Sequence, residues 1–232
     1  MSFYSFTPLS VQSVISCLVE LAVLLAHHAA FANAGQMCSC GSRTFVHEKI
    51  YDQFLEKSVL LAQKRIVGNP FDSSTQQGPQ ISRTQLEKVL SYVESGKSQG
   101  ATLSTGGECT NTSGYFMQPT IFSNVKDDMT IAKEEIFGPV MCVLKYNDYD
   151  EVIKRANNTD FGLAAGVITK DLTRSLKFID KLKAGSVWIN DYHAMRSNAP
   201  FGGYKQSGHG REMGSYGLRE YYQVKAVAIK LA

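Results

Sequence analysis

Cys38 is the residue whose surroundings are most typical of a nucleophile. It lies in the loop 35–43, a run of small residues between an apolar segment and a strand-like one, where backbone N–H groups can face a ligand. A cysteine attacks as the thiolate, and its ordinary pKa of about 8.5 must be lowered by a helix N-terminus, a cation or a base. The sequence identifies no such activator for Cys38. A buried, inert cysteine is therefore the alternative interpretation.

The cysteines favour neither a disulfide framework nor a metal site. Their number is odd and their spacing irregular, which indicates a reducing compartment. Cys38 and Cys40 lie near His27, His28 and His47, but the paired CxxC motifs typical of structural zinc do not occur. We therefore expect no metal. The five cysteines are Cys17, Cys38, Cys40, Cys109 and Cys142.

The composition is that of a globular protein. The 232 residues are 44% hydrophobic and 19% charged, which is too apolar for a disordered chain and long enough for one large domain or two small ones. The net charge of +3 is spread along the sequence without a long run of Lys or Arg. This distribution predicts binding neither to nucleic acid nor to an anionic membrane.

An apolar run over residues 11–31 permits two interpretations. Ala30 and Ala32 resemble the small residues of a signal-peptide cleavage site, which would make the run a secretory signal. No Lys or Arg precedes it, however, and Glu20 and two histidines interrupt it short of the roughly 20 apolar residues that a membrane span needs. We expect a buried helix, no membrane association and a cytoplasmic protein, with the mitochondrion as the alternative compartment.

Strand-like and helix-like segments alternate from Arg43 onward, and this alternation predicts an α/β fold with a largely parallel sheet covered on both faces. Apolar periodicity predicts a helix over 49–66. One face of that helix is expected to carry Tyr51, Leu55, Val59, Ala62 and Ile66. Strands are expected at 43–48, 101–105, 117–123, 140–146, 163–169 and 186–190.

Three later helices have clear start signals. Ser82 and Gln85 form a capping-box pattern before a helix with apolar residues at i, i+3, i+4 and i+7. Asp148 is expected to cap a helix that runs through Ala156, and Asp171 to cap another. These caps predict the residue at which each of the three helices begins.

The C-terminal part of the chain has two distinct patterns. Residues 191–217 are too polar and rich in glycine for a core element, so we expect an ordered loop or a tail. The last ten residues alternate as an exposed strand with apolar residues on both faces. Such a strand is expected either to pair with another subunit or to join the chain's own sheet.

Eight motifs in order together resemble the NAD(P)-dependent aldehyde dehydrogenase superfamily. They extend from about Ala22 to the end and match only the C-terminal, catalytic half of a complete member. The resemblance implies a divergent segment 1–21, a catalytic domain 22–206 and a tail 207–232 with an oligomerisation strand. The motifs are GQMCSCGSRTFV, GNPFD with QQGPQI, GYFMQPTIF, MTIAKEEIFGPV, ANNTDFGLAAGV, AGSVWIN, PFGGYKQSGHGREMGSYGL and VKAVAIK.

The resemblance implies that Cys38 is the catalytic thiol. Its thiolate would attack an aldehyde to give a thiohemiacetal, a hydride would pass to the nicotinamide of NAD or NADP, and hydrolysis of the thioester would release a carboxylate. The Cys38 N–H would form part of an oxyanion hole. Cys40, two residues further on, is interpreted either as a packed bystander or as the partner of Cys38 in a protective disulfide.

The resemblance also implies cofactor contacts. Glu135 matches the carboxylate that accepts the hydroxyls of the nicotinamide ribose, and Phe137 matches the ring beside the nicotinamide. Without the resemblance, Glu134 and Glu135 would be interpreted as a solvated pair. Gln85 and Lys88 occupy places of more distant ribose contacts, although a cap and an exposed helix face explain them equally well.

Four residues match positions that line the aldehyde tunnel in the family. Phe201 corresponds to an aromatic wall, and Ala32, His193 and Met195 to other lining positions. Ala32 stands where many relatives carry a large aromatic residue, which implies a wider tunnel on that side. For His193 an exposed loop position is the alternative interpretation.

Features that complete members carry upstream do not occur before Cys38. The sequence has no dinucleotide-binding glycine turn there, and the general-base glutamate, the oxyanion asparagine and the ribose-binding lysine are expected to be missing. Two alternatives to an active dehydrogenase follow. One is an impaired fragment that only binds full-length subunits through residues 222–232, and the other is a remnant that cleaves activated esters without cofactor.

Overall fold

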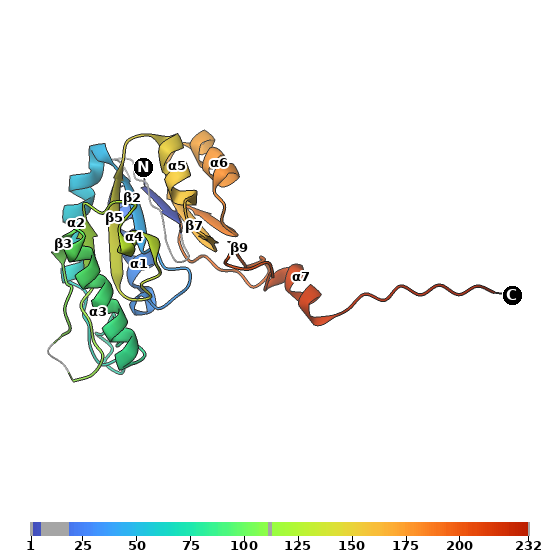
Figure 1. Ribbon diagram of the computed structural model, residues 1–232, viewed down its shortest axis with the longest axis horizontal. Helices are drawn as coiled ribbons and strands as arrows, with labels where there is room; N and C mark the ends of the chain where they lie inside the picture. Colours follow the sequence, from blue (N-terminus) through green and yellow to red (C-terminus); the bar gives the residue numbers. More distant parts are fainter. Residues whose placement is uncertain (1, 6–18, 111–112, 232) are drawn as a thin grey trace.

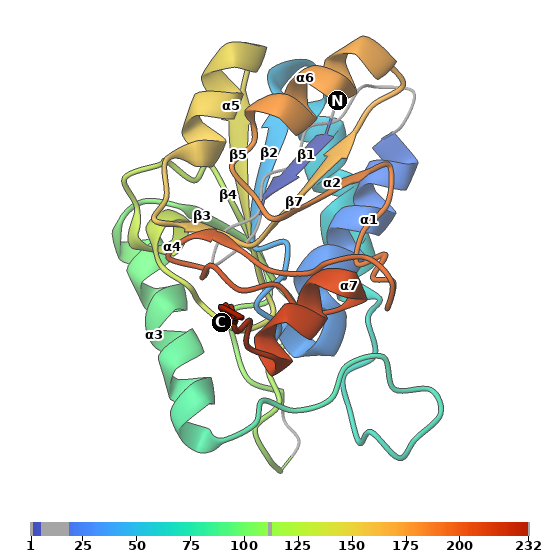
Figure 2. The ribbon, with the colours of Figure 1, turned by 90° about the vertical axis from the view of Figure 1, so that its right-hand side faces the viewer.

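The computed structural model describes residues 2–5, 19–110 and 113–231. Within these ranges the chain forms three layers, with a central sheet between two sets of helices (Figures 1 and 2). The expected α/β class is therefore confirmed. The Cys17 thiol and the first part of the apolar run, residues 11–18, lie outside the described residues.

The central sheet has seven strands in the order β3-β4-β5-β2-β1-β7-β8. β2, β4 and β5 are parallel, β7 and β8 are parallel, and β1 is antiparallel to both β2 and β7, so five strands run in one direction. This confirms the largely parallel sheet. The strands are β1 (Ser2–Ser5), β2 (Arg43–His47), β3 (Thr102–Thr105), β4 (Thr120–Ser123), β5 (Val140–Tyr146), β7 (Ala164–Ile168) and β8 (Ser186–Ile189).

β1 is a strand that the sequence pattern does not predict. It pairs with β2 on one side and with β7 on the other, inside the sheet. Its four residues have no alternation of their own that would indicate a strand. Pairing on both sides nevertheless satisfies backbone N–H and C=O groups that β2 and β7 would otherwise leave exposed.

Alternation along the strands divides the core into two halves. On β5, Cys142 and Leu144 face the half covered by α3, α5 and α6, whereas Met141 and Val143 face α1 and α2. A parallel strand buried on both faces needs such a continuous apolar run. The helices are α1 (Val19–Phe31), α2 (Tyr51–Gln63), α3 (Arg83–Ser98), α4 (Thr130–Lys133), α5 (Tyr149–Asn157), α6 (Leu172–Lys181) and α7 (Gly214–Gly217).

α1 accounts for the described part of the apolar run. It buries seven of its thirteen residues against β5 and α2, so the expectation of a buried helix holds for residues 19–31. Among the described residues, no helix is both long and apolar enough to cross a bilayer.

α2 corrects one prediction. Tyr51 and Ala62 are buried as expected, but the helix ends at Gln63, and Ile66 lies beyond it with 48% of its surface exposed. Between them the buried positions are Phe54 and Ser58 instead of Leu55 and Val59, which are only partly buried. Phe54 fills the space toward the sheet, and this rotates the buried face by about one residue.

The N-cap bond forms at each of the three predicted helix starts. The side chain of Ser82 accepts from Gln85 N at 3.2 Å, Asp148 accepts from Glu151 N at 2.8 Å and Asp171 accepts from Arg174 N at 2.9 Å. Each bond satisfies an otherwise unpaired N–H of the first helical turn. The sequence therefore predicts the starts of α3, α5 and α6 correctly.

Residues 191–217 are an ordered loop with two short elements. β9 (Tyr204–Lys205) pairs antiparallel with β6 (Phe161–Gly162), and α7 follows at 214–217. Beyond them the tail 222–231 is extended and points away from the sheet (Figure 1). The alternative that these last residues join the chain's own sheet is therefore wrong.

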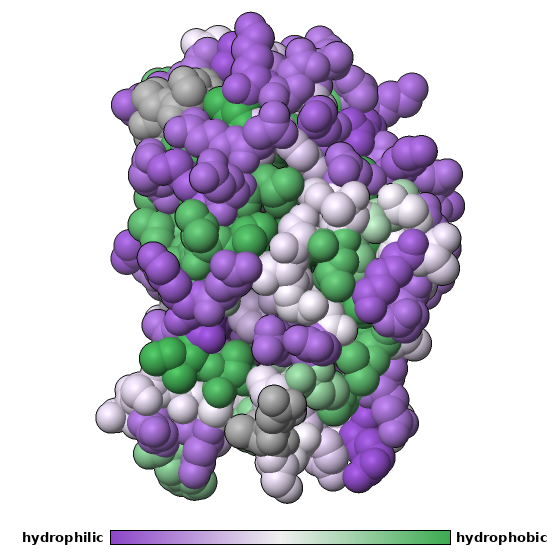
Figure 3. Space-filling view, turned by 90° about the vertical axis from the view of Figure 1, so that its left-hand side faces the viewer, coloured by the Kyte–Doolittle hydropathy of each residue, from purple (hydrophilic) through white to green (hydrophobic). Residues whose placement is uncertain are grey.

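Part of the helical surface is apolar. Figure 3 shows the face that carries α2, α3 and β3, where hydrophobic patches lie between polar ones. Leu24, Leu60 and Leu61 line a groove of about 310 Å³ between α1 and α2, and the first two are 57% and 49% exposed. Apolar surface of this kind is typical of contact with another domain or chain.

Candidate active site around Cys38

Cys38 lies in the loop between α1 and β2, and its side chain is exposed. Gly41 N donates to Ala29 O at 2.7 Å, and Cys40 N donates to Met37 O at 3.0 Å, so the loop is tied to the end of α1. Cys38 is therefore not buried, contrary to the alternative interpretation. An exposed thiol on a hydrogen-bonded loop is accessible to a small electrophile.

The backbone just before Cys38 is strained. Asn33, Ala34 and Gly35 have φ values of 51°, 55° and 72°, which place three successive residues in the left-handed region. For residues with a side chain this conformation costs roughly 1–2 kcal/mol each. Gln80 Nε2 stabilises the turn by donating to Ala34 O at 3.2 Å. Strain held by tertiary contacts is frequent at functional sites.

Two side chains from the far end of the chain hold the residue after Cys38. Ser39 O accepts from the hydroxyl of Tyr192 at 2.8 Å and lies 3.2 Å from His193 Nε2. Burial lowers the pKa of His193 to about 4, so the ring is neutral at pH 7 and its Nε2–H tautomer donates. The nucleophile loop is thus fixed to the segment that follows β8.

Replacing Tyr192 by phenylalanine should lower the free energy of unfolding by about 1 kcal/mol, because a buried hydrogen bond is lost while the ring remains. Urea denaturation followed by circular dichroism measures this change. Tyr221→Phe is the matched control, since Tyr221 is 88% exposed. Equal midpoints for the two variants would contradict a structural role of the Tyr192 hydroxyl.

The four residues predicted to contact the cofactor lie together at α3 and the segment after α4. Gln85 Nε2 donates to Phe137 O at 2.9 Å, so the capping box lacks its returning side-chain bond and Gln85 instead holds the segment that carries Phe137. Burial raises the pKa of Glu135, and the Lys88 ammonium nearby opposes that shift. Lys88 lies near the carboxylate, although a direct ion pair is not formed.

The neighbouring carboxylates have different surroundings. Glu134 is exposed and accepts from the hydroxyl of Tyr92 at 2.9 Å. Glu135 is half-buried, and in the described part of the chain its carboxylate accepts no hydrogen bond. The interpretation as a solvated pair is therefore wrong for Glu135. A half-buried acceptor without a protein donor is suited to the hydroxyls of a ligand.

Cys40 connects the nucleophile loop with the Glu135 segment. Its thiol is buried and donates to Ala32 O at 3.9 Å. Burial, with smaller contributions from the charges of Cys38 and Glu135, raises the pKa of Cys40 to about 12, although the backbone hydrogen bond with Met37 opposes the shift. Both groups therefore lie within electrostatic reach of Cys40, which stays protonated at neutral pH and packs as a bystander.

The four residues predicted to line the aldehyde tunnel do not all line the same cavity. Met195 and Phe201 line one cavity of about 200 Å³, and Trp188 lines the same cavity. The His193 ring instead packs 4.5 Å from Tyr192 and turns toward Ser39. Ala32 is next to Cys40 and does not line this cavity. His193 is therefore half-buried rather than an exposed loop histidine.

Sequence reasoning missed several residues that position the site. Tyr192 contacts a residue 153 positions away, and Gln36 Oε1 accepts from Ile81 N at 2.8 Å. No periodicity or spacing connects such distant segments. Only side-chain chemistry could have indicated these residues. Amide and hydroxyl groups in otherwise apolar segments are usually buried with a hydrogen-bond partner.

The histidines near Cys38 in sequence do not converge on it. The His47 ring packs 5.2 Å from Tyr146, whereas His28 packs 5.4 Å from His193. Over residues 2–5, 19–110 and 113–231, no group of three or more His, Cys, Asp or Glu side chains is arranged to hold a metal ion.

Known proteins are similar to this chain over most of its length. Residues 15–227 match the Aldehyde dehydrogenase family. A mitochondrial aldehyde dehydrogenase of Mesocricetus auratus is 55% identical over 213 residues, and a mitochondrial benzaldehyde dehydrogenase of Antirrhinum majus is 56% identical over the same length. In both comparisons 92% of this chain is covered, against 43% and 40% of the relative.

Solved structures give the same result. The NAD⁺ complex of aldehyde dehydrogenase from Bacillus cereus has a TM-score of 0.93 and 46% identity, and the match covers 99% of this chain and 46% of that one. A betaine aldehyde dehydrogenase from Staphylococcus aureus, in complex with NAD⁺, has a TM-score of 0.85 and 42% identity over 88% of this chain and 42% of its own. The chain thus spans less than half the length of these relatives, and it belongs to the aldehyde dehydrogenase family.

Proposed function

We propose that this chain carries the catalytic half of an enzyme that oxidises an aldehyde to a carboxylate with NAD or NADP. The observation that supports this most is the exposed Cys38 thiol on a loop packed beside Glu135, with Cys40 in reach of both. Family membership supports the same chemistry. The proposed domain division remains 1–21, 22–206 and 207–232.

The Cys38 thiolate would add to the carbonyl carbon of the aldehyde and form a C–S bond, leaving the oxygen as an alkoxide. Backbone N–H groups of the loop would donate to that oxygen. A hydride then leaves the carbon to give a thioester on Cys38, and attack by water releases the carboxylate and regenerates the thiol. NAD or NADP, when bound, accepts the hydride.

The residues beside Cys38 fit such a cofactor. The Glu135 carboxylate offers oxygens to two ribose hydroxyls, and the Lys88 charge opposes the rise in its pKa that burial causes. Gln85 fixes the backbone at Phe137, whose φ of 58° is held by that bond, so the ring would be presented to the nicotinamide. Met195 and Phe201 would surround the aldehyde.

The purified 232-residue chain, mixed with a simple aliphatic aldehyde and NAD, tests the proposal by absorbance at 340 nm. NADH formation supports a dehydrogenase. A folded chain that cleaves an activated ester without forming NADH would instead identify the hydrolytic remnant. A folded chain with neither activity would contradict an independently active enzyme and favour the impaired fragment.

The exposed tail supports a second role as a subunit-pairing element. Apolar side chains along it have large exposed fractions: Val224 91%, Val227 73%, Ile229 80% and Leu231 88%. An extended segment with unpaired N–H and C=O groups is a template for pairing with a strand of another chain. We infer that it joins a second copy of this chain or a full-length relative.

The double variant Val227→Lys and Ile229→Lys should be monomeric where the unmodified chain forms an oligomer, because two charges would be buried in the strand interface. Light scattering after size exclusion measures the mass. Lys225→Gln with Lys230→Gln is the matched control on the same segment and should keep the assembly. Equal masses for all three proteins would exclude the tail as the pairing element.

For the compartment, we infer the cytoplasm from the composition and the cysteine pattern. The mitochondrial names of several relatives belong to those proteins and point to the mitochondrion as the alternative. Subcellular fractionation of the full chain distinguishes these compartments.

A further inference from the structure

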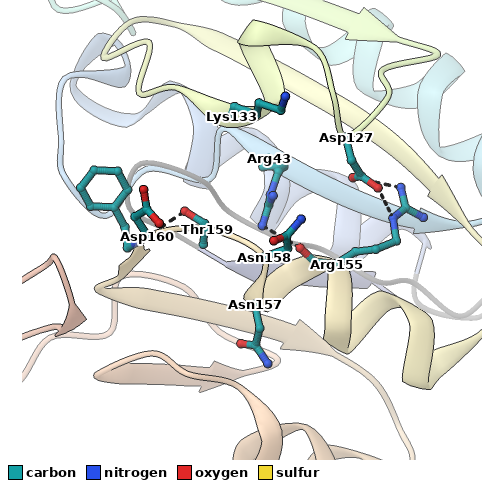
Figure 4. Close-up of a pocket in the computed structure, with 9 residues that line it drawn as sticks. Arg43, Asp127, Lys133, Arg155, Asn157, Asn158, Thr159 and Asp160 are labelled. Atoms are coloured by element: carbon teal, nitrogen blue, oxygen red, sulfur yellow. Dashed lines mark hydrogen bonds and ion pairs between the residues drawn. The ribbon is translucent and has the colours of Figure 1, made fainter.

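A second pocket lies away from Cys38, between the start of β2, α4 and the turn from α5 to β6. Its volume is about 350 Å³, and apart from Phe161 the side chains that line it are polar or charged (Figure 4). None of the residues assigned above to the thiol, the cofactor or the aldehyde lines it. The lining residues are Arg43, Asp127, Lys133, Arg155, Asn157, Asn158, Thr159, Asp160 and Phe161.

Arg43 is the main reason to expect a ligand here. Only 2% of its surface is exposed, and its Nη2 donates to Ala156 O at 2.8 Å and to Arg155 O at 3.4 Å. Its Nε is a buried donor with no hydrogen-bond partner in the described part of the chain. A buried cation with an unpaired N–H is costly unless an anion accepts from it.

The carboxylate of Asp127, which lines the pocket, already pairs with another arginine. Asp127 accepts from Arg155 Nε at 2.6 Å and from Arg155 Nη2 at 3.3 Å, so its hydrogen bonds form a bidentate pair with Arg155. The guanidinium groups of Arg155 and Arg43 lie 4.8 and 5.2 Å from the centre of the same Phe45 ring. Arg155 Nη1 also donates to Glu151 at 3.1 Å, so both carboxylates bond Arg155 and neither bonds Arg43.

Other cations add to this positive field. Lys133 lines the pocket, and no ion pair to it is formed within the described ranges. Lys205 Nζ donates to Asn157 O and Thr159 O, both at 2.8 Å. Burial lowers the pKa of Lys205, and the charges of Lys183 and Arg43 lower it further. Asp160 also lines the pocket, and its exposed carboxylate adds a negative charge that opposes these cations.

Neutral donors complete the surface. Asn158 and Thr159 offer an amide and a hydroxyl, and the Thr159 oxygen also accepts from Phe161 N at 3.3 Å. The amide of Asn157 points away from the other labelled side chains (Figure 4), since it bonds Lys181 O at 2.8 Å. A dianion with several acceptor oxygens matches fixed N–H donors and cations better than a neutral ligand does.

We propose that this pocket binds a small phosphate-bearing anion, either inorganic phosphate or a phosphate monoester, through the Arg43 guanidinium and Lys133 with Asn158 and Thr159 as neutral donors. Phosphate is favoured over a single carboxylate because its tetrahedral oxygens reach donors on several sides of a pocket. The volume also leaves room for the organic part of a small monoester.

Isothermal titration of the full 232-residue chain with inorganic phosphate, at constant ionic strength, tests the proposal. Lys133→Gln should weaken phosphate binding about tenfold, because one charge-assisted hydrogen bond is lost. Asp160→Asn should strengthen it, since it removes the repelling carboxylate. Lys154→Gln is the matched control: it removes the same charge from the surface of α5, outside the pocket, and should leave the affinity unchanged.

The same titration is repeated with glycerol phosphate and with acetate in place of inorganic phosphate. Tighter binding of glycerol phosphate assigns the pocket to organic phosphates, and equal or weaker binding assigns it to inorganic phosphate. The proposal is overturned if phosphate produces no heat, if acetate binds as tightly as phosphate, or if Lys133→Gln and Lys154→Gln bind phosphate equally.

Discussion

Replacing Cys38 by serine is expected to lower aldehyde oxidation by at least about a thousandfold, and to remove any ester cleavage. A serine hydroxyl is far less ionised than a thiol near neutral pH, and the loop offers no base to activate it. NADH formation at 340 nm measures the first activity, and release of nitrophenolate from nitrophenyl acetate measures the second. The fold should be unchanged, because the Cys38 side chain is exposed.

Two other cysteines are the controls for this variant. Cys109 is also exposed, so Cys109→Ser removes an accessible thiol without touching the loop. Cys40 is buried beside the site with a pKa of about 12, so Cys40→Ser tests packing rather than nucleophilicity. Both should keep most of the activity. If Cys109→Ser lost as much activity as Cys38→Ser, the assignment of Cys38 as nucleophile would fail.

Replacing Gly35 by alanine is expected to destabilise the protein by about 3 kcal/mol and to disrupt the site. The φ of +72° is unfavourable for any side chain, and the added methyl group would overlap the carbonyl oxygen of Gly138. Gly138 follows the segment of Glu135 and Phe137, so the two halves of the site would be pushed apart. Urea denaturation measures the stability loss.

The variant Gly100→Ala separates the strain of a positive φ from the overlap with the Gly138 carbonyl oxygen. Gly100 has a φ of +89°, but nothing lies within 4 Å of an added methyl group, so this variant should cost only about 1–2 kcal/mol of conformational strain. The difference between the variants reports the contact with Gly138. Equal losses would show that the loop yields to the methyl group and that close approach is not needed.

Local chemistry made much of the fold predictable. Asp148 and Asp171 mark helix starts because a short acceptor side chain satisfies free N–H groups within three residues. The apolar run of β5 predicts a strand buried on both faces for an equally local reason. β1 and the buried face of α2 were not predictable, since pairing on both sides and the fit of Phe54 depend on partners elsewhere in the chain.

In the candidate site, too, some features follow from local sequence and others depend on contacts with distant parts of the chain. The order of motifs in the sequence predicted that Cys38 and Glu135 belong to the site, but it did not predict their environments. Exposure of the thiol, the raised pKa of Glu135 and the turn of His193 toward Ser39 arise from burial and from contacts across the fold. Exposure and burial are properties of packing and have no local signal.

The sequence by itself determined the α/β class, the helix caps and the family resemblance, because each depends on short-range patterns or on motifs in order. Only the tertiary structure decided that Gln85 holds the backbone at Phe137 and that Tyr192 holds the loop of Cys38. It alone also left Arg43 buried with an unpaired N–H. The physical reason is that hydrogen bonds and charges between distant segments are specified by three-dimensional proximity, which spacing along the chain does not encode.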